Sequence, residues 1–246
     1  MIRAIIVSVD YADLLSITLP YNRHHFSEVM VVTSYNDEDT VCVAQENAAH
    51  VYQTNAFYTD GAVFNKFRAL EEGLDVFGRY GWMCIMDADV LWPKHIGWNF
   101  LNDNCMQSGD YFLYTPLRRM CEDVVHVPHE PYWKSYPLHP QQVEWAGYTQ
   151  IFHAEDPHLP PAPWHQTNWK HAGGADSFFQ QLWPASCKLR PPFECLHLGR
   201  AGVNWAGRVT PFTDGSQHPD AAVRLITLRN FMKIRRETQS FDSEKI

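Results

Sequence analysis

Short apolar runs punctuate the first half of the chain and are separated by polar or mixed segments. Residues 2–9, 29–33, 50–54 and 82–86 have the length and the apolar character of strands. The run at 82–86 follows Gly81 and opens directly onto acidic residues, as a buried strand that ends in a turn does. These runs therefore predict strands of a single sheet.

Two stretches between the runs have a different period. Residues 39–49 and 61–77 carry apolar side chains at helical spacing, and Gly78 follows the longer one as a helix terminator. The apolar positions of the longer stretch are Val63, Phe64, Phe67, Leu70, Leu74 and Phe77. Strands that alternate with helices predict an α/β fold with a mostly parallel central sheet flanked by helices.

Polar residues stand where three of the predicted strands end. They are Asp10 and Tyr11, Thr33 and Ser34, and Asp87 and Asp89. In a parallel sheet the carboxyl ends of the strands share one edge, and ligands bind beyond that edge. We therefore expect these side chains to converge on one crevice.

The sequence Asp87-Ala88-Asp89 places two carboxylates two residues apart at the end of a buried strand. Like charges this close repel each other unless a cation neutralises them. Mg²⁺ and Mn²⁺ take oxygen ligands and are often held by one or two carboxylates together with substrate phosphates. A metal site for a phosphorylated substrate competes here with a plain acidic turn, because Asp is common where strands end.

The second half of the chain has less periodicity. Residues 111–115, 148–153 and 196–198 predict strands, and Asp176 stands where it would cap a short helix over 177–182. The loop-rich stretch 118–172 is too long for a simple connection, and such length is typical of functional or mobile loops. A glycine-containing loop with Arg200 and Arg208 follows, and a basic helix is expected from Pro219.

Composition narrows the class of protein. The chain has 246 residues, of which 45% are hydrophobic and 20% are charged, with a formal net charge of -8. These values predict a globular domain and speak weakly against a surface built for nucleic acid. No apolar stretch reaches the roughly 20 residues of a membrane helix. The six cysteines form no C-x-x-C pair, and the start of the chain reads as a strand rather than a signal peptide, so a cytoplasmic location is expected.

Four motifs together resemble the glycosyltransferases of the GT-A fold, in the style of family 2. They are Ile85 to Val90 (I-M-D-A-D-V), Phe64 to Leu74 (F-N-K-F-R-A-L-E-E-G-L), Gly173 to Phe179 (G-G-A-D-S-F-F) and Cys195 to Gly199 (C-L-H-L-G), in the family's order. The resemblance covers roughly residues 1–210 and implies one catalytic domain over 1–246. Its nucleotide-sugar half would span 1–117, its acceptor half 118–218, and a terminal helix and tail 219–246.

The resemblance also implies roles for individual residues. Mn²⁺ or Mg²⁺ would be held by Asp89, by Asp87 and by His197 as a third ligand, and Asp176 would serve as general base or contact the sugar. The remaining donor-binding set would be Val9, Asp10, Tyr11, Thr33, Asn65, Lys66, Arg68, Ala88, Arg200 and Arg208. Each assignment has a plain structural alternative: Lys66 as a solvated lysine, His197 as a core histidine and Asp176 as a helix cap.

Two departures from the family pattern affect the acceptor. The late helix offers Ala175-Asp176 where two adjacent acids are usual, and Gln180-Gln181-Leu182-Trp183 does not replace the usual Q-x-x-R-W motif. Inversion and retention of the anomeric configuration therefore both stay open. So does the acceptor, for which a saccharide, a lipid-linked glycan, a protein and a hydroxylated base in nucleic acid are candidates.

The predicted activity is metal-dependent transfer of a sugar from a nucleoside-diphosphate sugar, with a UDP-sugar expected, to an acceptor hydroxyl. A nucleotidyltransferase of related fold is one alternative, although Ser8-Val9-Asp10-Tyr11 is not a glycine-rich phosphate loop. A non-catalytic sugar- or nucleotide-binding module is another, although it would have no need of the acids. The thirteen histidines show no zinc-binding spacing.

Overall fold

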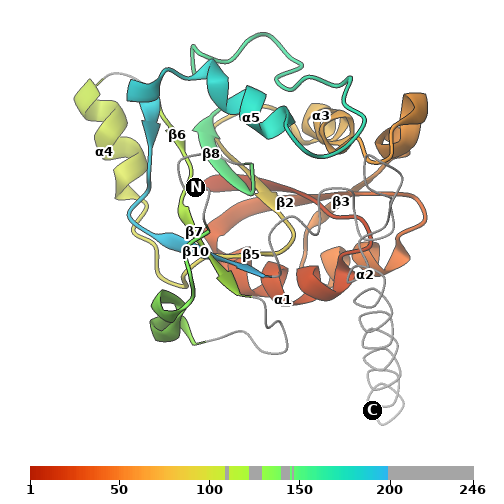
Figure 1. Ribbon diagram of the computed structural model, residues 1–246, viewed down its shortest axis with the longest axis horizontal. Helices are drawn as coiled ribbons and strands as arrows, with labels where there is room; N and C mark the ends of the chain where they lie inside the picture. The colour runs from red at the N-terminus through yellow and green to blue at the C-terminus, as the bar shows by residue number, and fades with distance from the viewer. Residues whose placement is uncertain (109–110, 122–128, 140–144, 146, 199–246) are drawn as a thin grey trace.

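The computed structural model describes residues 1–108, 111–121, 129–139, 145 and 147–198, and a seven-stranded sheet forms its centre (Figure 1). The order of the strands is β3-β2-β1-β4-β8-β6-β9. Their bounds are β1 Ile2–Val7, β2 Phe26–Thr33, β3 His50–Gln53, β4 Trp82–Asp87, β6 Leu113–Tyr114, β8 Thr149–His153 and β9 Lys188–Leu189. The first four strands of this order are parallel, and β8 is antiparallel to both β4 and β6. The fold is thus α/β with a mixed, mostly parallel sheet, as the sequence predicts.

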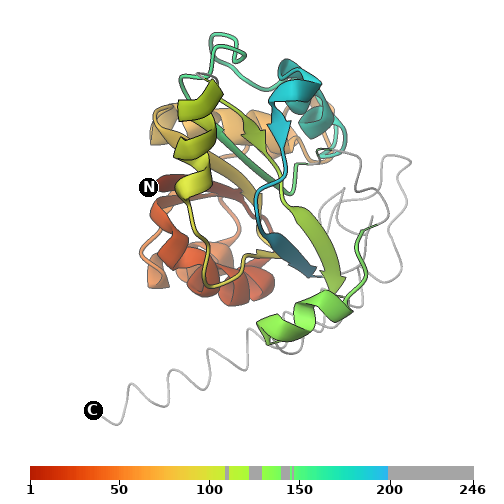
Figure 2. The ribbon, with the colours of Figure 1, turned by 90° about the vertical axis from the view of Figure 1, so that its left-hand side faces the viewer.

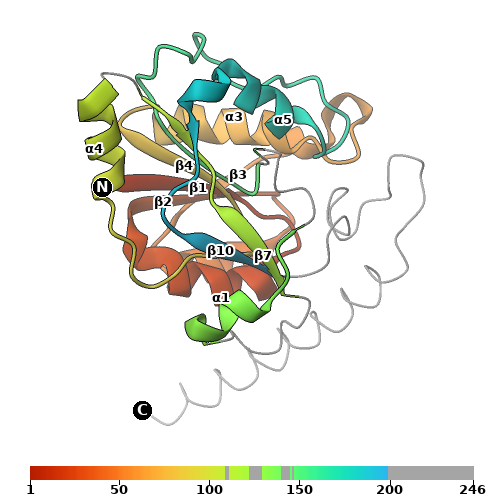
Figure 3. The same ribbon diagram turned by 60° about the vertical axis from the view of Figure 1, so that its left-hand side comes forward.

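Helices cover both faces of the sheet (Figure 3). On one face, α1 (Ala12–Asn22) and α2 (Glu38–Glu46) pack in a cluster with Ala4 and Ile6 of β1. On the other face, α3 (Lys66–Phe77) and α5 (Ala175–Phe179) pack in a cluster with Ile5 and Val7. Burial on two faces explains why β1 is buried at all six positions and shows no polar alternation. At Gly73 of α3 a Cβ atom would lie 2.5 Å from a Val32 methyl group, so glycine permits the close approach of this helix to β2.

A second, three-stranded sheet has the order β5-β10-β7 (Figure 2). It consists of β5 (Val90–Leu91), β10 (Glu194–Leu198) and β7 (Leu117–Cys121), with β10 antiparallel to β5 and parallel to β7. Because β5 begins three residues after the end of β4, this small sheet brings the late strand β10 to the carboxyl end of β4.

Further helical segments lie between these elements. They are η1 Arg23–His25, η2 Ala56–Gly61, α4 Asn99–Ser108, η3 Glu130–Ser135, η4 Gln180–Leu182 and η5 Ala185–Cys187. None of the helices in the described part of the chain is both long and apolar enough to cross a bilayer.

Several predicted boundaries were wrong in detail. The helix expected over 61–77 begins only at Lys66, because residues 56–61 form η2 and the Asn65 side chain caps α3 by accepting the Arg68 N–H at 3.0 Å. The prediction of Asp176 as a helix cap was also wrong, since α5 begins at Ala175 and its N-cap is Gly174. The loop with Arg200 and Arg208 and the predicted terminal helix lie outside the described residues.

Candidate metal centre

Asp87, Asp89 and His197 come together at the carboxyl end of β4. Each offers one ligand atom, and these atoms all lie within 4.8 Å of one another. The backbone sets this arrangement, because His197 on β10 pairs with Val90 on β5 and the Leu198 N–H donates to the Asp89 carbonyl at 2.8 Å. The His197 Nε2 atom lies 3.5 Å from Asp89 Oδ1. The three residues that the resemblance implies as ligands are thus brought into one cluster.

The three side chains differ in their exposure to solvent. Those of Asp89 and His197 are buried, whereas the Asp87 side chain is 30% exposed. A buried carboxylate is costly unless it is paired or coordinates a cation. Two carboxylates and one imidazole form a donor set that suits a divalent ion such as Mn²⁺ or Mg²⁺, and the exposed side of Asp87 is where a phosphorylated substrate could approach it.

Lys66 adds a positive charge beside this cluster. It is the first residue of α3, its side chain is 12% exposed, and its Nζ forms an ion pair with Asp87 Oδ1. Burial opposes the charge, but Asp87, Asp176 and Asp89 outweigh it, so the pKa of Lys66 is raised. Lys66 is therefore a charged member of the cluster and not a solvated surface lysine.

Asp176 approaches the same cluster from α5. Its Oδ2 accepts the Gly147 N–H at 2.8 Å, and its Oδ1 accepts the Ser177 N–H at 2.9 Å. A Cβ atom on residue 147 would lie 2.2 Å from the Asp176 Cβ, so only glycine fits there. The next residue, Tyr148, accepts the Asp87 N–H on its carbonyl at 2.9 Å. The turn before β8 thus links Asp176 to the end of β4.

Asp37, which sequence reasoning missed, organises the ends of β1 and β2. Its carboxylate accepts hydrogen bonds from the Asp10 N–H at 2.7 Å, from the Thr33 hydroxyl at 3.1 Å and from the Thr40 N–H at 3.1 Å, where it caps α2. Asp10 itself has a φ of 58°, a left-handed conformation that costs a non-glycine residue free energy. The cap was readable as an Asp three residues before Thr40, but the bonds to Asp10 and Thr33 depend on the tertiary fold.

The other members of the predicted donor set lie deeper in the protein or engage neighbours. Val9, Tyr11 and Ala88 are buried, and the Ala88 carbonyl accepts the Thr18 hydroxyl at 2.6 Å. The Asn65 side chain caps α3 and donates to the Thr167 carbonyl at 2.8 Å. Direct contact of these residues with a donor stays a prediction.

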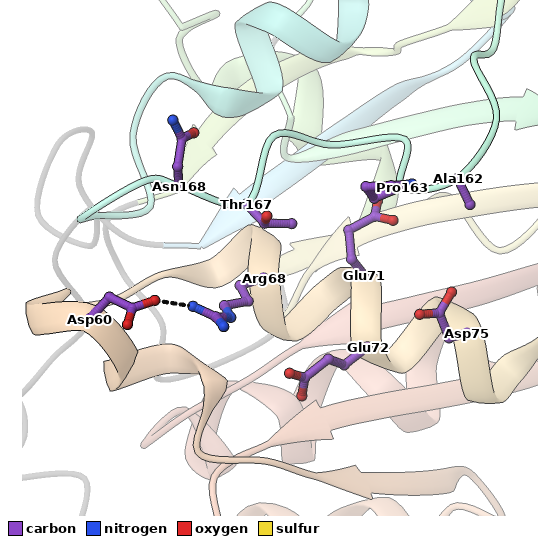
Figure 4. Close-up of a pocket in the computed structure, with 9 residues that line it drawn as sticks. All are labelled: Asp60, Arg68, Glu71, Glu72, Asp75, Ala162, Pro163, Thr167 and Asn168. Carbon is purple, nitrogen blue, oxygen red and sulfur yellow. Dashed lines mark hydrogen bonds and ion pairs between the residues drawn. The ribbon is translucent and has the colours of Figure 1, made fainter.

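Arg68 lies in a separate groove (Figure 4). Its guanidinium forms an ion pair with Asp60 in a cavity of about 520 Å³ between α3 and the loop 162–168. The acidic residues that line this groove are Asp60, Glu71, Glu72 and Asp75. A negative groove does not favour a diphosphate, so the structure gives no support to Arg68 as a phosphate contact.

Comparison with solved structures places the fold among GT-A glycosyltransferases. The structure of mannosyl-3-phosphoglycerate synthase from Rubrobacter xylanophilus is similar, with a TM-score of 0.52 at 14% sequence identity. The match covers 98% of this chain and 75% of the synthase chain. This likeness shows the GT-A fold that the sequence motifs imply, and shows the fold alone.

Two further solved structures are more distant. Glucosyl-3-phosphoglycerate synthase from Mycobacterium tuberculosis, solved with Mn²⁺, UDP-glucose and phosphoglyceric acid, has a TM-score of 0.33 at 17% identity over 48% of this chain and 44% of that one. The 4-diphosphocytidyl-2C-methyl-D-erythritol synthase of Anaerococcus prevotii has a TM-score of 0.35 at 14% identity over 63% and 71%. No family model and no curated protein sequence matches the chain.

Proposed function

We propose that this chain is a metal-dependent glycosyltransferase that moves a sugar from a nucleoside-diphosphate sugar to an acceptor hydroxyl. The observation that carries the proposal is the cluster of Asp87, Asp89 and His197 at the carboxyl edge of the sheet, with Lys66 beside it. This edge is where an open α/β sheet binds its ligands. A UDP-sugar is the expected donor.

The cluster suits the departure of a nucleoside diphosphate. A divalent ion held by Asp87, Asp89 and His197 would neutralise the negative charge that develops on the leaving diphosphate. Lys66, charged and next to Asp87, is placed to donate a hydrogen bond to a phosphate oxygen once a donor binds. In the transfer, the bond from the anomeric carbon to the diphosphate oxygen breaks, and its electron pair leaves with the nucleoside diphosphate.

Asp176 is the proposed general base. As the acceptor oxygen bonds to the anomeric carbon, its proton passes to the Asp176 carboxylate. The backbone N–H groups of Gly147 and Ser177 hold that carboxylate in a fixed orientation. A base in this role acts on the face opposite the leaving group and inverts the anomeric configuration, so the configuration of the product tests the assignment.

The experiment is a turnover assay on a panel of UDP- and GDP-sugars, with and without Mn²⁺. Mn²⁺-dependent release of nucleoside diphosphate, with water as the acceptor if no other is supplied, is expected, and excess EDTA should abolish it. The Asp89→Asn variant should lose at least about 99% of the rate, because a neutral amide is a poor ligand for a hard cation. Asp75→Asn, which changes an exposed carboxylate on α3, is the matched control and should retain full activity.

The alternatives give different products. A nucleotidyltransferase would release pyrophosphate from a nucleoside triphosphate and a sugar phosphate, and would leave nucleotide-sugars intact in the forward assay. A binding module would bind a nucleotide-sugar without turning it over. Either outcome, or full activity in excess EDTA, would contradict the proposed function.

A further inference from the structure

Two arginines lie against the aromatic residues that precede β8. The guanidinium carbon of Arg118 on β7 is 4.4 Å from the centroid of the Tyr148 ring, and that of Arg190 after β9 is 4.1 Å from the centroid of the Trp145 ring. Both cations also act on the Tyr148 hydroxyl, whose pKa burial raises strongly and these arginines partly lower. Because the Tyr148 carbonyl binds the Asp87 N–H, this pair of arginines adjoins the candidate metal centre.

The register of the small sheet places Arg118 relative to His197. On β7 and β10, Arg118 is the partner of Cys195 and Met120 is the partner of His197. Side chains two residues apart on a strand share a face, so Arg118 lies on the face of His197, roughly 7 Å along the strands. His139 lies next to Arg118, because its N–H donates to the Arg118 carbonyl at 3.0 Å, and its pKa is lowered to about 4 by burial first and then by Arg118 and His197.

Arg119 shows how the opposite face of β7 differs. Its guanidinium forms an ion pair with Glu194 at 2.5 Å and donates to the carbonyls of Lys134 and Tyr136 at 3.0 and 2.7 Å. These contacts tie β7 to β10 and to η3, a structural role. Arg118 lies on the other face of β7 with its guanidinium over the Tyr148 ring, and a guanidinium is a planar group that can bind phosphate bidentately.

Burial adds a second argument for an anionic ligand. Arg190 is half-buried, donates to the Thr115 carbonyl at 2.9 Å, and has its pKa lowered chiefly by burial. Two cations held close together in a partly desolvated place are stabilised by a bound anion with two charges. A phosphate monoester meets this requirement, whereas a single carboxylate carries only one charge.

We propose that Arg118 and Arg190 bind a phosphate monoester on the acceptor, so that the acceptor is a phosphorylated hydroxy compound. This inference rests on the proposed glycosyl transfer and names the acceptor class of the same site. The phosphate could belong to a soluble metabolite or to a lipid headgroup, since both present the same group.

The test compares matched acceptors on the full chain in the presence of Mn²⁺ and a turned-over nucleotide-sugar. Glycerol offers the hydroxyls alone, sn-glycerol 3-phosphate adds the phosphate in soluble form, and lysophosphatidic acid adds it in lipid form. A phosphorylated acceptor should be used at least about 10-fold more efficiently, as kcat/KM, than glycerol. Preference for the soluble or the lipid compound identifies the source of the phosphate, and either supports the proposal.

Variants locate the effect. Arg118→Gln and Arg190→Gln should each weaken binding of inorganic phosphate and of sn-glycerol 3-phosphate about 10-fold or more, while the affinity for Mn²⁺ with UDP changes less than about threefold. Arg119→Gln is the control on the same strand and should change neither affinity. Melting curves of all variants check that the fold is retained.

Different results would overturn this inference and the proposed function. Normal binding of Mn²⁺ with UDP combined with equal use of glycerol and both phosphorylated acceptors would overturn the phosphate site and leave the glycosyltransferase proposal standing. Absence of Mn²⁺ and UDP binding in wild type would overturn the proposed function itself. The acceptor comparison on wild type decides the matter even if a variant fails to fold.

Discussion

Lys66, Asp87 and Asp176 show how charge is distributed around the candidate centre at the scale of single residues. Lys66 pairs with Asp87, and its pKa is raised, against burial, by Asp87, Asp176 and Asp89. Among the described residues, Lys66 thus faces three carboxylates, so these four side chains together keep an excess of negative charge that a divalent ion would offset.

The substitution Asp176→Asn separates the two roles of this side chain. The carboxylate uses both of its oxygens, and an amide has only one, so the variant can keep the bond from Gly147 or the bond from Ser177 but not both. We expect a loss of about 1 kcal/mol of stability, or about 2–4 °C in Tm. Because an amide cannot take the acceptor proton, transfer should fall at least about a hundredfold. Activity within a few-fold of wild type would show that Asp176 only holds α5 against the turn at Gly147.

Part of the site could be predicted from residue patterns. Asp87 and Asp89 follow a strand, and His197 lies in another, so the resemblance could place all three at one edge. The role of Asp37 could not be predicted, because its contacts with Asp10 and Thr33 exist only once β1 and β2 lie side by side. The placement of Arg118 and Arg190 around Tyr148 could not be predicted either, because these residues come from three separate segments.

At the scale of elements, strands with strong apolar runs were predicted and two helices were missed. α1 contains Pro20, a residue that usually ends a helix, and α4 is rich in Asn and polar residues. Tertiary packing overrides this weakness in α1, since Leu14, Leu15 and Leu19 are buried against the sheet. The two-residue strand β5 is too short to give a sequence signal of its own. It is a strand only because it pairs with β10 just after the end of β4.

The element η1 gives the fold a pH dependence. His25 packs against Trp92 and Trp98 with ring centroids 5.7 and 5.9 Å apart, and its pKa is lowered to about 4, chiefly by burial and also by His24 and His95, with Glu130 opposing. The folded state thus holds His25 neutral, while the unfolded state takes up a proton near pH 6.5. This contribution to stability is complete above about pH 6.5 and is lost as the pH falls towards 4.

The variant His25→Phe should remove this dependence. Melting temperatures at pH 7 and at pH 4.5 should differ less in the variant than in wild type, by an amount equivalent to roughly 1–2 kcal/mol after allowance for solvent screening. His50→Gln, at an exposed position on β3, is the control and should retain the wild-type difference. Equal pH dependence in wild type and His25→Phe would refute the assignment.

At the scale of the whole molecule, the arrangement of the first part of the chain was predicted better than that of the second part. The parallel strands β3, β2, β1 and β4 follow from the alternation of strands and helices in residues 1–87, and the GT-A fold follows from the motifs. The antiparallel β8 was predicted as a strand but not in its direction, because nothing in the five residues Thr149–His153 encodes which neighbouring strand they pair with. The antiparallel direction matters, since it sets Gly147 and Tyr148 beside Asp87 and Asp176.

The most direct test of the central claim is the binding of Mn²⁺, followed by electron paramagnetic resonance, in the presence and absence of UDP. Wild type should bind Mn²⁺ more tightly in the presence of UDP than in its absence, because the diphosphate oxygens would supply further ligands. Asp89→Asn and His197→Ala should each weaken this binding at least about tenfold without loss of the folded state, while Asp75→Asn should bind as wild type does. Mn²⁺ binding that is unchanged in both Asp89→Asn and His197→Ala would contradict the account.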